Sequence, residues 1–170
     1  MSELLVEMLR HNTWANTKLV EFCRDLPTEK REGDTSITGT YGNIRDTLLH
    51  GVQAQEGYLR SYGRPDAPPP APEGFPNWDT LLERMRRSSQ GFEAFAAEAR
   101  DGDTWEGDFG AQLWRTPPSV VLTHIVTHAT EHRIHVATAI TQMGVEPPNL
   151  DAWQFGGQRG QVSAVDKKTT

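Results

Sequence analysis

The segment PPSVVLTHIVTHATEHRIHVATAITQMG, residues 117–144, carries the strongest helix signals in the chain. Two prolines open it, and proline is favoured in the first turn of a helix because the N–H it lacks would have no partner there. Gly144 stands where a helix C-cap is expected, and two further prolines follow at 147–148. We therefore predict a long helix over residues 117–143.

Four of the six histidines of the chain fall on this predicted helix. At about 100° per residue they lie within about 80° of its circumference, so they form one stripe. The stripe consists of His124, His128, His132 and His135. Histidines four residues apart can direct their imidazole nitrogens at one metal ion, which zinc requires at about 2.0–2.1 Å. His124 with His128, and His128 with His132, are therefore candidate metal-binding pairs.

A third ligand has to come from another helix, and His50 is the best candidate. It lies in a second predicted helix, flanked by the apolar residues Leu48, Leu49 and Val52. Burying an imidazole there without a partner would cost free energy, and metal binding removes that cost. We expect His50 to complete a metal site with histidines of the 117–143 helix.

Two other interpretations of the histidines remain open. In one, they are incidental polar residues of a purely structural helix bundle. In the other, the segment 128–132 (His-Ala-Thr-Glu-His) is an inverzincin motif, His-x-x-Glu-His. Glu131 would then be the general base, and the third ligand would be a carboxylate downstream of the motif. The carboxylates available there are Glu146, Asp151 and Asp166.

The rest of the chain predicts an all-α fold. Apolar residues three or four apart indicate helices over about 2–23, 41–61 and 77–100. Five prolines between residues 64 and 72 predict an extended connection, since proline interrupts helices and central strands. The segment 104–116 is expected to be a loop or small hairpin. Together these elements predict an up-down four-helix bundle with a short irregular or hairpin insertion before the fourth helix.

The 170 residues are enough for one domain, which we expect to span residues 1–170. We expect residues 151–155 to form a short turn that docks Trp153 and Phe155, and the tail from about residue 156 to 170 to be poorly ordered.

Composition and charge restrict the class of protein. There are 17 Lys and Arg against 23 Asp and Glu, a net charge of −6, which argues against nucleic-acid binding. We expect no membrane association, since no window approaches 18 apolar residues, and no secretory signal, since the N-terminus lacks a basic region followed by an apolar run. The single cysteine, Cys23, cannot form an internal disulfide, as suits a reducing compartment. We therefore expect a cytoplasmic protein.

Three segments, taken together and in this order, resemble the DinB family, also described as DinB/YfiT-like metalloenzymes. The first is Trp-Ala-Asn-Thr-Lys-Leu at 14–19, which resembles the family's aromatic-small-Asn segment. The second is 42–56, which contains Ile44 and the Leu-Leu-His ending at His50. The third is 124–133, which reads His-x-x-x-His-x-x-x-His-Arg. The resemblance extends over about residues 5–145.

The resemblance implies a four-helix bundle with a three-histidine site for a divalent metal ion such as zinc or nickel. Its ligands would be His50, His128 and His132, whereas the position of His124 is usually not a ligand. After Arg133 the chain departs from the family, because Ile-His follows where the family often has Gly-Gln. Many members form homodimers, and some are thiol transferases that use low-molecular-weight thiols such as bacillithiol or mycothiol.

Three neutral imidazoles leave the metal its full charge and at least one open position, as in catalytic rather than structural sites. The expected activity is transfer of a low-molecular-weight thiol to an electrophile, or metal-dependent hydrolysis, with Glu131 as candidate catalytic base. The alternative is a non-catalytic stress-response protein that binds a metal or small molecule. Asp46, one turn before His50, could orient the histidine's second nitrogen. Tyr58 and Arg133 are further candidates for contacts around the site.

Overall fold

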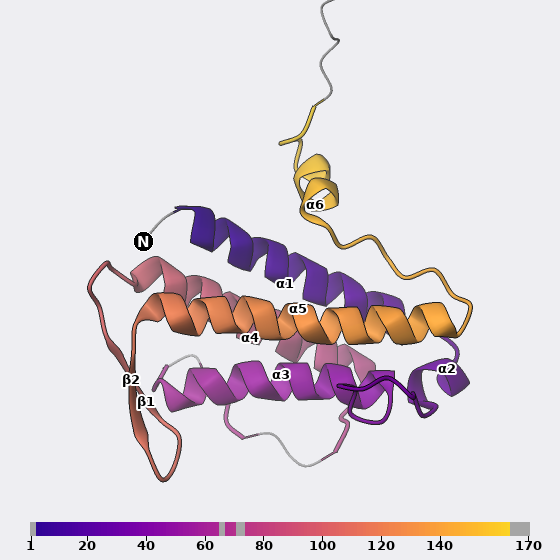
Figure 1. Ribbon diagram of the computed structural model, residues 1–170, viewed down its shortest axis with the longest axis horizontal. Coiled ribbons are helices and arrows are strands. Elements are labelled where there is room, and N and C mark those ends of the chain that lie inside the picture. The colour runs from indigo at the N-terminus through magenta and orange to yellow at the C-terminus, as the bar shows by residue number, and fades with distance from the viewer. Residues whose placement is uncertain (1–2, 65–66, 71–73, 164–170) are drawn as a thin grey trace, which may run out of the picture.

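The computed structural model describes residues 3–64, 67–70 and 74–163, and it confirms the all-α fold class. Four long helices pack side by side (Figure 1): α1 (Glu3–Arg24), α3 (Ile44–Ser61), α4 (Trp78–Glu98) and α5 (Pro118–Gln142). Two short helices, α2 (Thr28–Glu32) and α6 (Ala152–Gln158), flank them, and α2 is not among the predicted elements. The insertion before α5 is an antiparallel hairpin of β1 (Trp105–Asp108) and β2 (Leu113–Thr116).

Side-chain caps determine where three of these helices begin. Asn43 accepts a hydrogen bond from the backbone N–H of Asp46 and starts α3 three residues later than predicted. Asn77 caps α4 in the same way, and Asp151 caps α6. An Asn or Asp in this position satisfies one of the N–H groups that the first turn leaves without a partner. Pro118 occupies the first turn of α5, as predicted.

The contacts between helices give their directions. Residues 55 and 56 of α3 bond residues 88, 89 and 84 of α4, whereas Leu59 packs with Phe92 and Phe95 farther along both helices. Helices α3 and α4 therefore run parallel, which differs from a strict up-down alternation. The reason is the connection of residues 62–77 between them. An extended chain gains about 3.1 Å per residue, so a connection of this length is long enough to span α3; residues 65–66 and 71–73 of the proline-rich stretch lie outside the described residues.

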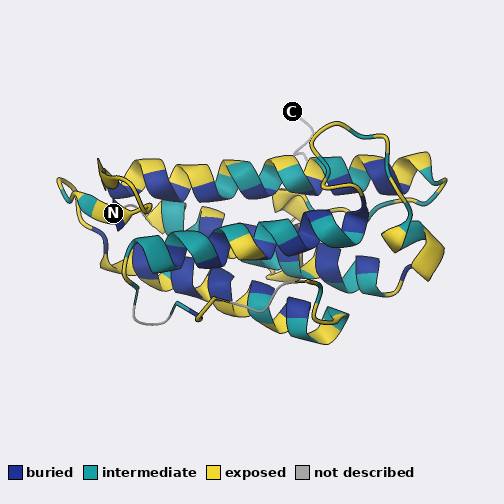
Figure 2. Ribbon diagram, turned by 90° about the horizontal axis from the view of Figure 1, so that it is seen from below, coloured by how far each residue is buried: buried dark blue, intermediate teal, exposed yellow. Residues whose placement is uncertain are grey.

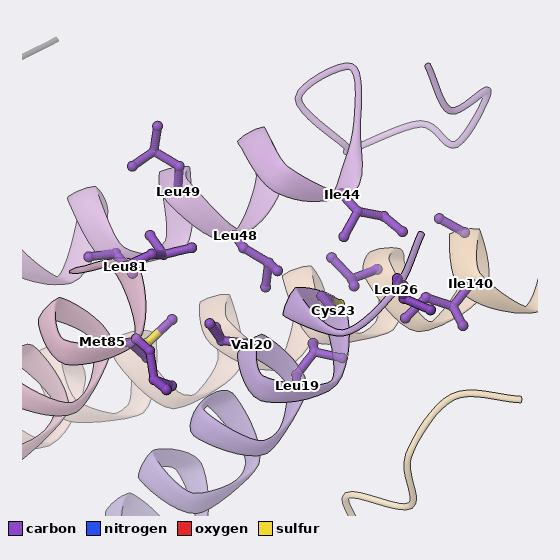
Figure 3. Packing of buried hydrophobic residues seen from close by; sticks show 14 residues of the cluster. Leu19, Val20, Cys23, Leu26, Ile44, Leu48, Leu49, Leu81, Met85 and Ile140 are labelled. Atoms are coloured by element: carbon purple, nitrogen blue, oxygen red, sulfur yellow. The ribbon is translucent and has the colours of Figure 1, made fainter. Parts of the chain in front are cut away.

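The buried faces of the four long helices turn toward one another (Figure 2). One core cluster joins α1, α3, α4 and the C-terminal half of α5; Figure 3 shows Leu19, Leu48, Met85 and Ile140 converging in it. A second cluster, which includes Leu9, Phe92 and Leu122, fills the end of the bundle near the hairpin. The stretch of α5 that carries the histidines lies between the two clusters, so the packing on both sides fixes its position.

The C-terminal part differs from the prediction at one residue. Phe155 is buried against His11 and Trp14, but Trp153 is 74% exposed and does not dock. Because Asp151 caps a true helix, residues two positions apart point about 200° apart around it. Of the tail predicted to be poorly ordered, residues up to Gln158 belong to α6, and residues 164–170 lie outside the described residues. Among the described helices, none is long and apolar enough to cross a membrane.

Candidate metal centre

The structure brings together the three histidines that the sequence singled out. His50 of α3 and His128 and His132 of α5 each place a ring nitrogen within 4.8 Å of the other two. The ring centroids of His50 lie 5.6 Å from His128 and 4.9 Å from His132. The Nε2 atoms of His128 and His132 are 3.1 Å apart. Two nitrogens bound tetrahedrally to zinc are separated by about 3.3 Å, so this pair is already close to a ligand geometry.

The cluster forms because α3 and α5 pack against each other in opposite directions. The residues around His50, Leu49 and Val52, are buried between the helices, so the imidazole leaves α3 at the edge of this contact. One turn separates His128 from His132, and both rings therefore meet the ring of His50 from the same side of α5. Each of the three side chains is half-buried, which leaves one side of the cluster accessible.

Arg133 anchors the helix directly behind the cluster. Its guanidinium is buried and donates hydrogen bonds of 2.6 Å to the side-chain oxygens of Asn12 and Asn16 on α1. A third hydrogen bond goes to the hydroxyl of Thr130. Burial lowers the pKa of Arg133 to about 10, so the group stays charged at neutral pH. The aromatic-small-Asn segment and the His-Arg segment, far apart in sequence, thus meet through Asn16 and Arg133.

Burial keeps the imidazoles of the cluster neutral. Burial, together with the neighbouring imidazoles of His128, His50 and His135, lowers the pKa of His132 to about 4. Burial and His128 lower the pKa of His50, while burial and His124 lower that of His128. A metal ion binds the neutral imidazole, which is the form that these three groups have at neutral pH. The Nδ1 atom of His132 is buried and has no hydrogen-bond partner among the described residues.

Tyr41, which the sequence did not single out, covers one side of His50. The two rings stack with centroids 3.9 Å apart, and the Tyr41 hydroxyl lies 2.9 Å from His50 Nε2. The residue precedes α3 in an irregular segment, where periodicity gives no information about side-chain direction. Its hydroxyl is placed to contact whatever binds at the cluster.

The other sequence candidates lie outside the cluster. Glu131 is exposed, although its charge acts on His128 and opposes the lowering of that residue's pKa. The carboxylate of Asp46 accepts hydrogen bonds from the side chains of Asn43 and Arg45 at the start of α3, and these contacts take the place of the predicted one with His50. His50, not a downstream carboxylate, joins His128 and His132. The carboxylates of the inverzincin interpretation are exposed, at Glu146 and Asp151, or lie outside the described residues, at Asp166.

Three further histidines have other partners. His124 Nε2 lies 2.9 Å from the hydroxyl of Tyr58. The ring of His135 lies against Gly39, where even one added carbon would come within 2.4 Å of it. His11 Nε2 lies 2.8 Å from the carbonyl oxygen of Leu150, far from the cluster in sequence.

Comparison with known proteins agrees with this arrangement. The family model of the DinB family matches residues 1–160 of the chain. The chain belongs to the DinB family. No curated protein matches the chain in a sequence search.

The residues present fit a divalent metal ion. Three imidazole nitrogens from two helices converge, their pKa values are lowered, and zinc and nickel both accept imidazole ligands. The cluster of this DinB protein could therefore hold a metal ion, with His50, His128 and His132 as the ligand set.

Proposed function

We propose that this DinB protein is a metal-dependent enzyme that transfers a low-molecular-weight thiol to an electrophile. The ion would be zinc or nickel, held by His50, His128 and His132. The observation that carries the proposal is the convergence of three half-buried, neutral imidazoles with one side accessible. A divalent ion with only neutral ligands keeps its charge, and it would lower the pKa of a thiol or water bound at its open position.

The chain's own residues would orient the reactants. Arg133 fixes the register of α5 relative to α1, and with it the direction of the His132 ring. Tyr41 covers one side of the cluster and leaves the side toward the hairpin for a substrate. In the transfer, the thiol sulfur forms a bond to the electrophilic carbon, the leaving group departs with its electron pair, and the thiol proton passes to solvent.

Metal-dependent hydrolysis is the second candidate. It is favoured by Glu131, whose charge acts on His128 from one turn away and which could serve as catalytic base for a water molecule. A non-catalytic stress-response protein that binds metal or a small molecule would use the same cluster without turnover. We further propose a cytoplasmic homodimer, as the family resemblance suggests, without a nucleic-acid or membrane partner.

The test uses full-length protein purified without a polyhistidine tag and loaded with zinc or nickel. Bacillithiol, mycothiol and glutathione are each offered with 1-chloro-2,4-dinitrobenzene, whose chloride leaves as the thioether forms. We expect metal-dependent thioether formation with at least one thiol. His128→Ala should lower the rate at least about 100-fold, because the remaining two imidazoles hold the ion poorly.

His11→Ala is the matched control, because this histidine bonds Leu150 and lies outside the cluster. It should keep its rate. If no thiol in the panel reacts, transfer is excluded for these thiols; hydrolysis of 4-nitrophenyl acetate that depends on Glu131 would then support the second candidate. Metal binding without either activity would support the non-catalytic alternative.

A further inference from the structure

A cavity of about 500 Å³ lies between the hairpin and the adjacent ends of α3 and α5. Its lining is mostly aromatic and aliphatic, and includes Phe109, Trp114, Val120 and Val121. An apolar cavity of about 150 Å³ is enough to bind benzene, so this one can hold a considerably larger molecule. Its volume also lies within the range of about 300–1,000 Å³ that is typical of small-molecule sites.

The hairpin is fixed firmly enough to serve as a wall of this cavity. Trp105 of β1 stacks on Phe95 of α4, with centroids 3.5 Å apart and planes 9° apart. Gly107 lies so close to Tyr62 and Phe109 that an added Cβ would come within 2.7–2.9 Å of their rings. Close packing of this kind favours a single arrangement of the hairpin, because shifting it would require several rings to move together.

Polar groups also line the cavity: Gln112 and Thr116 on the hairpin, and one hydrogen-bonded pair on the helices. The hydroxyl of Tyr58 and Nε2 of His124 are 2.9 Å apart, and both residues line the cavity. Burial, and to a lesser extent Tyr62, raises the pKa of Tyr58, so its hydroxyl stays protonated at neutral pH. A phenolic oxygen has one donor and two acceptor positions, so Tyr58 keeps hydrogen-bonding capacity for a ligand.

The cavity adjoins the metal centre. His124 lies one turn before His128, and their rings stack with centroids 5.4 Å apart. A molecule that contacts His124 is therefore separated from the three-histidine cluster by that one imidazole ring. Among the described residues that line the cavity, none is Asp, Glu, Lys or Arg. This lining favours a neutral ligand, since an ionic one would lose its hydration without a partner.

We propose that this cavity binds the electrophilic substrate, a neutral and largely apolar molecule with an aromatic or branched aliphatic group and one hydroxyl or carbonyl oxygen. The apolar group lies against Phe109 and Trp114, and the oxygen bonds Tyr58. The reactive end then points toward His128. This assignment of a substrate class rests on the proposed function, but the binding site itself does not. The exposed apolar side chains of the hairpin, Trp114 at 55% and Phe109 at 42%, lose contact with water when it fills.

The experiment is isothermal titration calorimetry of the full-length protein with 4-propylphenol, and with propylbenzene as the matched probe without a hydroxyl. We expect 4-propylphenol to bind more tightly than propylbenzene. Tyr58→Phe should weaken 4-propylphenol about fivefold and leave propylbenzene unchanged, because it removes only the hydrogen-bonding group. Tyr41→Phe is the matched control, since Tyr41 also bonds a histidine but lies outside the cavity lining. It should leave both probes unchanged.

A second pair of variants tests the location. Ala111→Trp should fill the cavity and weaken both probes at least about tenfold, and Ala111 is exposed, so the fold tolerates the change. Ala97→Trp, also exposed but on α4, should have no effect. Unchanged binding in Ala111→Trp overturns the proposal. The proposal is also overturned if the wild-type protein binds neither probe and forms a dimer that Trp114→Glu dissociates. A second copy of the chain would then cover the hairpin.

The two proposals can fail separately. Probe binding without thiol transfer supports the cavity and contradicts the transferase activity. Metal-dependent thiol transfer whose KM for 1-chloro-2,4-dinitrobenzene is unchanged in Ala111→Trp supports the transferase and contradicts the cavity as the electrophile site.

Discussion

Two tyrosine–histidine pairs lie beside the contact between α3 and α5. They share one hydrogen-bonding distance, but the rings are stacked in the first pair and steeply tilted in the second. In each, a tyrosine hydroxyl is 2.9 Å from a histidine Nε2: Tyr41 with His50, and Tyr58 with His124. The first pair adjoins two further imidazoles, and the second adjoins an apolar cavity. The surroundings of a histidine therefore determine whether it belongs to a metal cluster.

The spacing of the histidines along α5 does not by itself distinguish the three-histidine cluster from the pair beside the cavity. His124 and His128 have the same four-residue separation as His128 and His132. Because α3 and α5 are antiparallel, moving eight residues along α3 from residue 50 to 58 corresponds to moving from residue 132 to 124 on α5. At one end α3 supplies an imidazole, and at the other it supplies Tyr58. The residue on α3 selects which pair can form a three-histidine site.

The largest effect is expected from replacing a histidine of the three-histidine cluster by the tyrosine found beside the hairpin. His50→Tyr places at residue 50 the side chain found at residue 58, and removes one of three ligands. We expect metal affinity to fall at least about 100-fold, measured by competition with a chromogenic chelator. His124→Tyr, a matched change on the same face, should leave metal affinity unchanged. Equal affinity in His50→Tyr and wild type would refute the assignment of His50.

The position of the three-histidine cluster also depends on the buried guanidinium of Arg133 behind it. Asn16→Ala removes one of the two amide oxygens that accept hydrogen bonds from Arg133. A lost hydrogen bond to a charged group costs about 1.5–3 kcal/mol, so the free energy of unfolding should fall by that amount in urea denaturation. Gln53→Ala, at an exposed position of α3, should change it by less than about 0.5 kcal/mol. Similar losses of unfolding free energy in the two variants would mean that the hydrogen bond between Arg133 and Asn16 does not stabilise the fold.

The metal-free protein should lose stability in mild acid. His132 has a folded-state pKa of about 4 and an ordinary value of 6.5, so the unfolded chain binds the extra proton between these pH values. Its contribution is present above pH 6.5 and is lost as the pH falls toward 4. After allowance for solvent screening we expect a loss of about 1 kcal/mol, or about 2–4 °C in Tm. Chelator-treated His132→Asn, measured by thermal denaturation at pH 7.5 and 5, should show a smaller change. An equal loss of stability in wild type and His132→Asn would contradict a role for the lowered pKa of His132.

The smallest effect separates the two tyrosines. The Tyr41 hydroxyl competes with a metal ion for His50 Nε2, so Tyr41→Phe should tighten metal binding about two- to fivefold. Tyr58→Phe, which removes the equivalent hydroxyl at the hairpin end, should leave metal affinity unchanged. Calorimetric zinc titration measures both. Weaker metal binding in Tyr41→Phe would instead indicate that the hydroxyl supports the bound ion.

The sequence predicted the helices that carry the cluster because their signals are local. Proline in the first turn, Gly144 at the end and the histidine stripe of α5 all follow from helix geometry. His50 was found because a histidine beside Leu48 and Leu49 is unusual on a core-facing helix without a partner. Its contact with α5, however, depends on how the two helices pack, which no local signal specifies.

The parts that the sequence did not predict depend on contacts between distant segments. The parallel direction of α3 and α4 is seen in contacts between the two helices, which no local signal specifies. Tyr41 lies in an irregular segment, and Arg133 pairs with Asn12 on another helix, so no periodic pattern indicated either contact. The cavity lies between the hairpin and the tyrosines Tyr58 and Tyr62, and no local pattern specifies how a loop or hairpin at 104–116 packs against α3.

The most direct test of the three-histidine centre is anomalous X-ray diffraction at the zinc absorption edge, from crystals of the untagged protein grown with one equivalent of zinc. We expect one peak per chain, about 2.0–2.1 Å from a ring nitrogen of each of His50, His128 and His132. A peak between His124 and His128 that excludes His50, or no peak on this face of α5, would contradict the account.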